Sequence, residues 1–189
     1  MTRFLKALGC VSIFALIFTI TSAIPVAKET TIYIVRHAEK ETSDPTNNNP
    51  ELNQEGKQRA LALKKFLKKE KISAVFSTNY KRTMQTAAPI AQHNGLPVKT
   101  YETKDPEGLV KLVKSEFTDQ EILVVGHSNT ILELVKAFGL QTPVDKLNDD
   151  DYDLLFIVSL YKNGETGLQI KRFGKSHHST EIAVSKKGH

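Results

Sequence analysis

The sequence predicts an α/β fold: a three-layer sandwich in which helices flank a mostly parallel central sheet, followed by an antiparallel hairpin. Two observations predict it. Short apolar runs alternate with longer segments of helical periodicity between about residues 31 and 138, which is typical of parallel strands joined by crossover helices. Two further apolar runs then flank Asn163 and Gly164, a pair that favours a tight turn between antiparallel strands.

The individual elements follow from local patterns. In residues 55–69, Ala60, Leu63, Phe66 and Leu67 recur at helical spacing while lysines fill the other face, and Asn53 is a plausible cap. Glycines suited to left-handed helix ends follow two later segments, and Pro106 suits a first turn. We expect strands over 31–36, 74–77, 97–101 and 121–126, further helices over 82–94, 106–117 and 129–138, and a hairpin of 154–161 with 167–173.

Composition and length are those of a single soluble domain. The chain has 189 residues, 40% of them hydrophobic and 25% charged, which is enough for a core without disulfides or metals. We place the domain at residues 30–174 and expect the polar tail, 175–189, to be disordered. The formal net charge of +5 is too mild to indicate nucleic-acid binding.

The N-terminus has the pattern of a signal peptide. Arg3 and Lys6 precede an apolar stretch, and small residues follow it. We expect cleavage after Ala23, with Ala27 as the next site and an uncleaved membrane anchor as the alternative. The protein would then be exported, periplasmic or secreted, without a stable membrane span. The single cysteine, Cys10, would leave with the signal, which excludes thiol catalysis, disulfides and thiolate metal sites in the mature protein.

Polar residues follow three of the predicted strands directly. Arg36 and His37 end the first, Arg82 lies just past the second, and His127 follows the most apolar one. Carboxyl ends of parallel strands meet at one edge of a sheet, so we expect these four side chains to share a pocket. A guanidinium can bind two phosphate oxygens at once, and an imidazole can attack or transfer a proton. The pattern predicts a site for a small phosphorylated molecule.

Four ordered motifs carry a family resemblance. The run from Arg36 to Glu39 resembles the Arg-His-Gly-Glu motif of the histidine phosphatase superfamily, in the branch that includes the cofactor-dependent phosphoglycerate mutases, with Ala38 in place of the glycine as in phosphatase-like members. Three later segments resemble its following motifs: 52–60, 77–87 and 126–128. The resemblance covers about residues 30–173. It implies a phosphoglycerate mutase-like fold and a small, phosphatase-type member.

The resemblance also implies roles. His37 would be the nucleophile that forms a phosphohistidine, while Arg36, Arg82 and His127 would neutralise the phosphoryl oxygens. Because arginines replace the cation, no metal or other cofactor is expected. Family members place a carboxylic acid in the loop that here holds Glu102, Asp105 and Glu107. We take Asp105 as the proton donor and the other two as alternatives; Asp105 could equally be only a helix cap.

Weaker candidates surround this set. Glu39 would orient the site or be structural. Ser128 and Asn129 could donate hydrogen bonds to phosphate or cap the following helix. His177 and His178 read as solvated tail residues and not as metal ligands, because no partner stands at ligand spacing.

The sequence therefore predicts a phosphatase that hydrolyses phosphomonoesters of a small molecule. The first alternative is a phosphoglycerate-mutase-like phosphoryl transferase, although the chain has little room for the lid such an enzyme needs, and the loop 40–50 does not match the mutases. The second alternative is a catalytically inactive phosphate-binding module.

Overall fold

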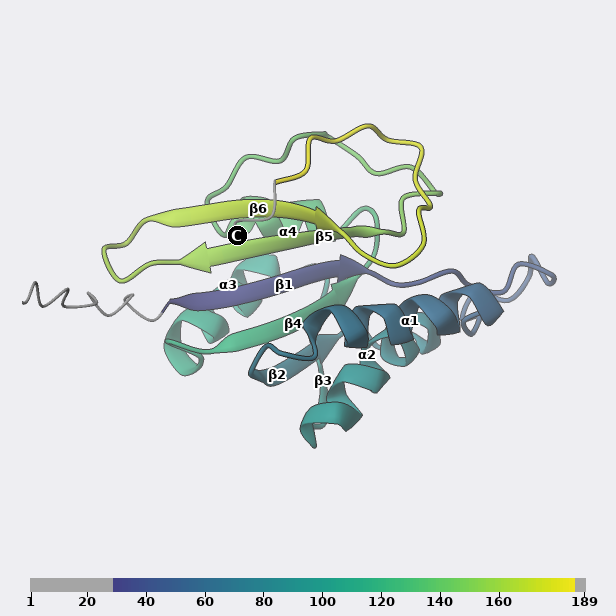
Figure 1. Cartoon of the computed structure of the whole chain (residues 1–189), viewed down its shortest axis with the longest axis horizontal. Helices are drawn as coiled ribbons and strands as arrows, with labels where there is room; N and C mark the ends of the chain where they lie inside the picture. Colours follow the sequence, from purple (N-terminus) through teal and green to yellow (C-terminus); the bar gives the residue numbers. More distant parts are fainter. Residues whose placement is uncertain (1–28, 186–189) are drawn as a thin grey trace, which may run out of the picture.

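The computed structural model describes residues 29–185, and the predicted signal segment lies outside them. No helix within this part of the chain is long and apolar enough to cross a membrane. Six strands form one sheet in the order β3-β2-β4-β1-β5-β6 (Figure 1). The strands are β1 (Thr30–Arg36), β2 (Ile72–Ser77), β3 (Val98–Thr100), β4 (Glu121–Gly126), β5 (Leu154–Leu160) and β6 (Thr166–Arg172).

The sheet is parallel on one side and antiparallel on the other. β1 pairs in parallel with β4, as β2 does with both β4 and β3. β5 is antiparallel to β1, and β6 is antiparallel to β5. The predicted mostly parallel sheet with a C-terminal hairpin is confirmed. Because β5 starts and β6 ends beside the carboxyl end of β1, the loops flanking this hairpin also reach the edge at which ligands bind.

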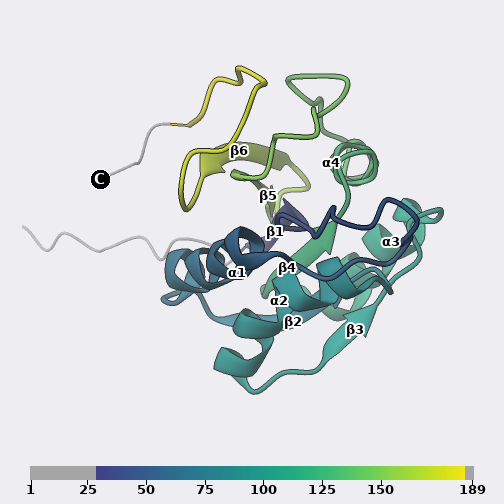
Figure 2. The ribbon, with the colours of Figure 1, turned by 90° about the vertical axis from the view of Figure 1, so that its right-hand side faces the viewer.

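The helices form the two outer layers. They are α1 (Gln54–Leu67), α2 (Lys81–Asn94), α3 (Pro106–Glu116) and α4 (Ile131–Ala137). Figure 2 shows α1 and α2 on one face of the sheet and α3 and α4 on the other. Alternate residues of β1 supply both cores: Ile32 and Ile34 pack on the α3/α4 side, and Tyr33 and Val35 on the α1/α2 side. Burial on both faces explains why the central strands are apolar throughout.

Helix ends agree with the sequence pattern at most positions. The Asn53 side chain accepts a hydrogen bond of 2.8 Å from the Gly56 amide, so the predicted cap of α1 is present. Gly95 follows α2 with a φ of 65°, a left-handed conformation that costs glycine little. α4 starts two residues later than expected, because His127 and Thr130 close a tight turn that brings the chain away from β4 first.

The C-terminal segment differs from expectation. Within residues 175–185, the side chains of His177, His178, Thr180, Ile182 and Ser185 are partly or fully buried, so the prediction of a disordered, solvated tail is wrong for these residues. Ile182 is buried in the α3/α4 core, and His178 donates a 2.6 Å hydrogen bond to buried Asp153. The polar composition is misleading because these polar groups pair with carboxylates that the domain buries.

Candidate active site

Three adjacent strands deliver the predicted site residues to one edge of the sheet. Arg36 ends β1, His37 follows it, His127 follows β4, and Arg82 lies in the first turn of α2 after β2. The His37 amide donates to the Gly126 carbonyl at 2.9 Å, and the rings of His37 and His127 lie 5.4 Å apart. Arg82 stacks on Tyr80, 4.5 Å from its ring centre, and Tyr80 contacts His127. The four side chains therefore gather as expected.

His37 is held in the tautomer that a nucleophile needs. Its Nδ1 lies 2.8 Å from the Ala38 carbonyl oxygen, which can only accept, so Nδ1 carries the proton and Nε2 keeps its lone pair. Burial lowers the pKa of His37 to about 3, and the charges of Arg36, His127 and Arg82 act in the same direction. The imidazole is therefore neutral at neutral pH.

Arg36 is oriented by a loop from the far end of the chain. Its Nη1 donates to the carbonyls of Asn148, at 2.9 Å, and Asp149, at 3.0 Å. The guanidinium also lies over the Tyr152 ring at 4.3 Å. These contacts fix the plane of the guanidinium. Its Nη2 lies 3.8 Å from a carboxylate oxygen of the exposed Asp149, and its Nε–H is left for another partner.

The Nε–H of Arg36 has no partner, and neither does the Nε–H of Arg82. Within residues 29–185, the buried side-chain nitrogen and oxygen atoms that lack a hydrogen bond are Arg36 Nε and Arg82 Nε. Leaving a buried donor unsatisfied costs about 1–3 kcal/mol, and more for a charged group. Two such donors beside a neutral His37 fit an anion with several acceptor oxygens.

His127 is positioned by a pair of threonines. Its Nε2 shares a 2.9 Å hydrogen bond with Thr78 Oγ1, which in turn contacts Thr83 Oγ1 at 2.9 Å. Burial, followed by the charges of Arg82 and Arg36, lowers the pKa of His127 to about 4. Thr78 follows β2 and Thr83 lies in α2, so β2, β4 and α2 together set the angle of this ring.

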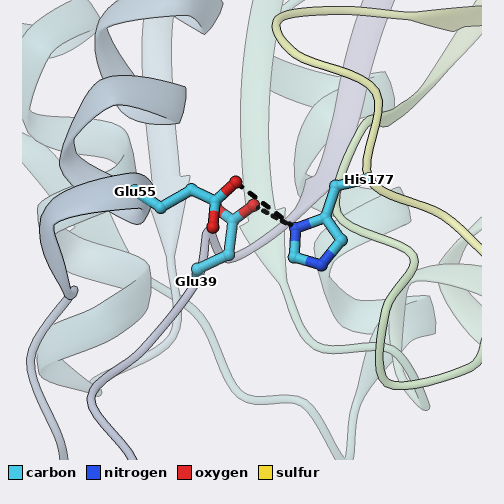
Figure 3. Close-up of side chains that lie close together, drawn as sticks. All are labelled: Glu39, Glu55 and His177. Carbon is cyan, nitrogen blue, oxygen red and sulfur yellow. Dashed lines mark hydrogen bonds and ion pairs between the residues drawn. The ribbon is translucent and has the colours of Figure 1, made fainter.

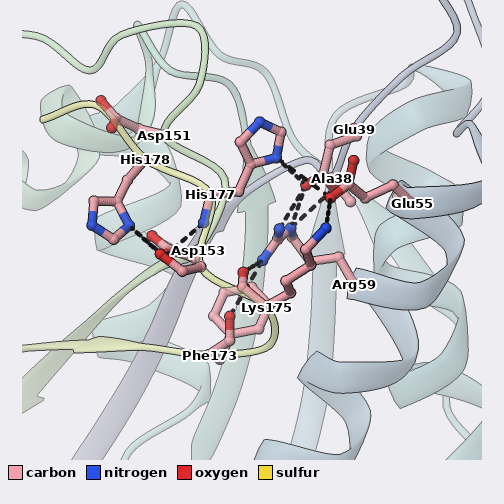
Figure 4. A network of polar contacts seen from close by, with 12 residues as sticks. Ala38, Glu39, Glu55, Arg59, Asp151, Asp153, Phe173, Lys175, His177 and His178 are labelled. Carbon is pink, nitrogen blue, oxygen red and sulfur yellow. Dashed lines mark hydrogen bonds and ion pairs between the residues drawn. The ribbon is translucent and has the colours of Figure 1, made fainter.

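Glu39 forms a buried network of hydrogen bonds next to the site residues. Both of its carboxylate oxygens accept hydrogen bonds from Arg59 Nε, at 2.8 and 2.9 Å (Figure 4). His177 Nδ1–H also donates to Glu39, at 2.8 Å (Figure 3). Burial raises the pKa of Glu39, but the hydrogen bonds from Arg59 and His177 outweigh it and the net shift is downward. Glu39 thus stays ionised and ties α1 to the loop after His37.

Glu39, Glu55 and His177 also form the kind of group that can hold a divalent cation. One ligand atom from each lies within 4.8 Å of the others (Figure 3). Both carboxylates, however, already form ion pairs with cationic side chains. Arg59 Nη2 is 2.6 Å from Glu39, and Lys175 Nζ is 3.7 Å from Glu55. Repulsion from these two charges disfavours a metal ion here.

The predicted acid, Asp105, lies at the same edge but in a different setting. It is exposed at the start of α3, where its carboxylate accepts a 2.9 Å hydrogen bond from the Gly108 amide. The structure thus gives Asp105 the cap role, and its catalytic role stays a prediction. Glu102 and Glu107 are likewise exposed.

The turn after β4 is built differently from our expectation. Thr130, and neither Ser128 nor Asn129, closes it: Thr130 Oγ1 accepts from the His127 amide at 3.1 Å. Ser128 is half-buried in this turn, where its predicted contact with phosphate stays untested. Packing explains the glycine at position 126, because a Cβ there would lie 2.7 Å from the Tyr101 hydroxyl and 2.9 Å from Ile131.

Several residues that build the site escaped the sequence analysis. Tyr152, Thr86 and Arg59 have no local pattern that assigns them a role, although Thr86 and Arg59 stand inside quoted motifs. Thr86 Oγ1 accepts from the Ala38 amide at 2.9 Å and so holds the chain just past His37. His177, which we expected to be solvated, contacts Glu39.

Comparisons with known proteins relate this α/β fold to the histidine phosphatases. Residues 32–103 match the model of the histidine phosphatase superfamily (branch 1), which confirms the resemblance seen in the motifs. A search of curated proteins gave no match.

Solved structures with a similar fold include two that are named as phosphatases. The protein histidine phosphatase SixA, complexed with tungstate, is 17% identical with a TM-score of 0.59, covering 79% of this chain and 96% of its own. A mycobacterial glucosyl-3-phosphoglycerate phosphatase is 15% identical with a TM-score of 0.59, covering 78% and 100%. Bacillus stearothermophilus YhfR is 18% identical with a TM-score of 0.58, covering 74% and 95%. At these identities the likeness shows the fold.

Proposed function

We propose that this protein is a phosphatase that hydrolyses phosphomonoesters of a small molecule through a phosphohistidine on His37. One observation carries the proposal. The two buried donors without partners, Arg36 Nε and Arg82 Nε, belong to the guanidiniums that flank an imidazole whose Nε2 is unprotonated. A phosphoryl group supplies the acceptor oxygens that both donors lack, and it is an electrophile for Nε2.

The chemistry would proceed in two displacements. His37 Nε2 attacks phosphorus, the N–P bond forms, and the bond to the leaving oxygen breaks as that oxygen takes a proton from Asp105. Water then attacks the phosphohistidine, its proton returns to the carboxylate, and the N–P bond breaks to release phosphate. Arg36, Arg82 and His127 stabilise the charge on the phosphoryl oxygens in both steps, and Nδ1–H stays on the Ala38 carbonyl throughout.

The proposal includes independence from metal ions. Two guanidiniums already provide the positive charge that a metal supplies in other phosphoryl-transfer sites. We expect hydrolysis to persist unchanged in excess EDTA. Loss of activity that Zn²⁺ or Mg²⁺ restores would contradict this part.

The test is a panel of phosphomonoesters, including p-nitrophenyl phosphate and sugar phosphates, assayed with wild type and His37→Ala. We expect hydrolysis by wild type and a loss of at least about 10³-fold in the variant, in line with removal of a nucleophile. Quenching with alkali and with acid should reveal an adduct that is stable to the first and labile to the second. An unchanged rate in His37→Ala would overturn the mechanism, and transfer between substrates without hydrolysis would favour a mutase.

We also propose that the protein is exported, on the pattern of basic, apolar and small residues between Arg3 and Ala23. N-terminal sequencing of secreted protein should start shortly after Ala23 or Ala27. A retained Met1 would exclude cleavage.

A further inference from the structure

The loop of residues 148–152 decides where Arg36 points, yet it contains neither helix nor strand. Its backbone carbonyls at Asn148 and Asp149 accept from Arg36 Nη1, and its Tyr152 ring stacks against the guanidinium. The position of the unpartnered Nε–H of Arg36 therefore depends on the position of this loop. Something outside the loop must hold it in position.

Asp151 is the point at which the loop is held. It is 1% exposed, and its Oδ2 accepts from the Asn148 amide at 2.6 Å, which closes the loop on itself. Its other donors come from the C-terminus. The amides of Ser179 and Thr180 donate to Oδ1 at 3.1 and 2.9 Å, and Thr180 Oγ1 donates to Oδ2.

Residues 177–182, here called the C-terminal strap, meet the loop at further points. The Tyr152 amide donates to the His177 carbonyl at 3.0 Å, and Asn148 Nδ2 donates to Thr180 Oγ1 at 3.0 Å. Ile182 at the end of the strap is buried. In Figure 1 the yellow segment after β6 runs alongside the green segment before β5, and Figure 4 shows His177 and His178 directed toward Glu39 and Asp153.

We infer that the C-terminal strap is part of the catalytic apparatus: through Asp151 it holds the 148–152 loop, and thereby positions Arg36 for the phosphoryl group. The inference rests on the proposed function. Thr180 and Asp151 are positioning residues, since they act on the bound anion only through Arg36. The mechanism is sensitive to this support because a displacement of about 1 Å in a positioned group can cost about 10²-fold in rate.

The experiment compares Thr180→Val with Thr180→Ser in the full chain. Valine has the shape of threonine but neither donates to Asp151 nor accepts from Asn148, whereas serine keeps the hydroxyl. The matched control is Ser185→Ala, which removes a hydrogen bond of the same C-terminal segment to β6, at the Ile170 amide, away from the loop. The readouts are the affinity for inorganic phosphate by calorimetry, kcat and KM for p-nitrophenyl phosphate, and the thermal midpoint.

We expect Thr180→Val to weaken phosphate binding and to lower kcat/KM by about tenfold, the size of effect expected for one lost hydrogen bond to a charged group. Thr180→Ser should recover most of this loss, and Ser185→Ala should stay within twofold of wild type. Equal phosphate affinity in Thr180→Val and wild type would overturn the inference.

A double-mutant cycle separates positioning from general stabilisation. If the strap acts through Arg36, Thr180→Val should change phosphate affinity less than twofold in an Arg36→Met background. An equal loss in both backgrounds would show that the strap only stabilises the fold, and the inference would fall. Should Arg36→Met not fold, the Arg36 Nε–H resonance gives the same information: phosphate should shift it strongly in wild type and weakly in Thr180→Val.

The two proposals can fail separately. Wild type that binds phosphate without hydrolysing any ester, with weaker binding in Thr180→Val, would overturn the proposed hydrolysis and support the strap. Wild type that hydrolyses esters, with Thr180→Val unaffected, would overturn the strap alone.

Discussion

At the scale of single residues, the site depends on which donors are used and which are left free. Arg36 Nη1 donates to backbone carbonyls, whereas Arg36 Nε has no hydrogen-bond partner. His37 Nδ1–H donates to the Ala38 carbonyl, which leaves the lone pair of Nε2 available. The groups pointing at the proposed phosphate are thus those that the protein leaves unpaired, which is how a preorganised anion site is built.

The free edge of Arg82 leads to a first prediction. Arg82→Lys keeps the charge but loses the planar pair of donors, so kcat/KM should fall by about 10²-fold, as for removal of a donor to a transition-state oxyanion. Lys81→Met is the control: Lys81 is exposed and pairs with exposed Glu51, and its loss should change kcat/KM less than twofold. Steady-state kinetics on both variants provides the check. A similar fall in kcat/KM in both variants would mean that Arg82 acts only through its positive charge on the surrounding electrostatic potential.

A second prediction separates the two roles of Asp105. Asparagine caps helices about as well as aspartate, so Asp105→Asn should unfold at the same temperature as wild type. If Asp105 donates the proton, hydrolysis of phenyl phosphate should slow by about 10²-fold while p-nitrophenyl phosphate, whose leaving group needs little protonation, changes far less. An Asp105→Asn rate equal to wild type on both esters would remove it from the mechanism.

At the scale of elements, the first turn of α1 is pressed against the loop that follows His37. The Asn53 amide donates to the Glu39 carbonyl at 3.0 Å, and a Cβ on Gly56 would lie only 2.0 Å from that same oxygen. Glycine is needed here for close approach, since Gly56 lies within a regular helix. The contact sets the distance between α1 and the loop after His37, and with it the distance between Arg59 and Glu39.

A third prediction follows from that contact. Gly56→Ala should destabilise the protein by about 1–3 kcal/mol through the clash, although alanine is favoured over glycine within a helix by about 1 kcal/mol. Lys57→Ala, at the exposed next position of α1, is the control for propensity alone and should be near neutral. Urea unfolding of both variants decides the sign, and a more stable Gly56→Ala would show that α1 can move away freely.

At the scale of the whole molecule, the site couples stability to pH. The pKa of His37 is about 3 and that of His127 about 4, both below the ordinary value of 6.5. As pH falls below about 6.5 the unfolded chain takes up protons on these histidines while the folded protein does not, so acid favours unfolding. The stabilisation is full above pH 6.5 and is lost progressively toward pH 4 and then 3.

A fourth prediction expresses this linkage. The free energy of unfolding should fall between pH 7 and pH 5 by up to about 1.4 kcal/mol per pH unit for each histidine, a range in which Glu39 and Asp151 stay ionised because their net pKa shifts are downward. Urea titrations should give a shallower slope for His37→Gln, and an unchanged slope for His93→Gln, whose side chain is exposed on α2. Saturating phosphate should reduce the slope of wild type, and equal slopes in all three proteins would contradict the pKa shifts.

The sequence by itself determined the layers, most element bounds and the four central site residues. These are local properties: an apolar run predicts a buried strand, and a cation just after it must lie at the sheet edge because a parallel strand ends there. Only the tertiary structure decided what holds those residues in place. Arg36 donates to carbonyls 112 to 115 positions away, Glu39 meets His177 across the domain, and polar groups of residues 177–180 pair with the buried carboxylates of Asp151 and Asp153. A buried polar group must have a partner, but the identity of that partner depends on chain packing, which local patterns do not encode.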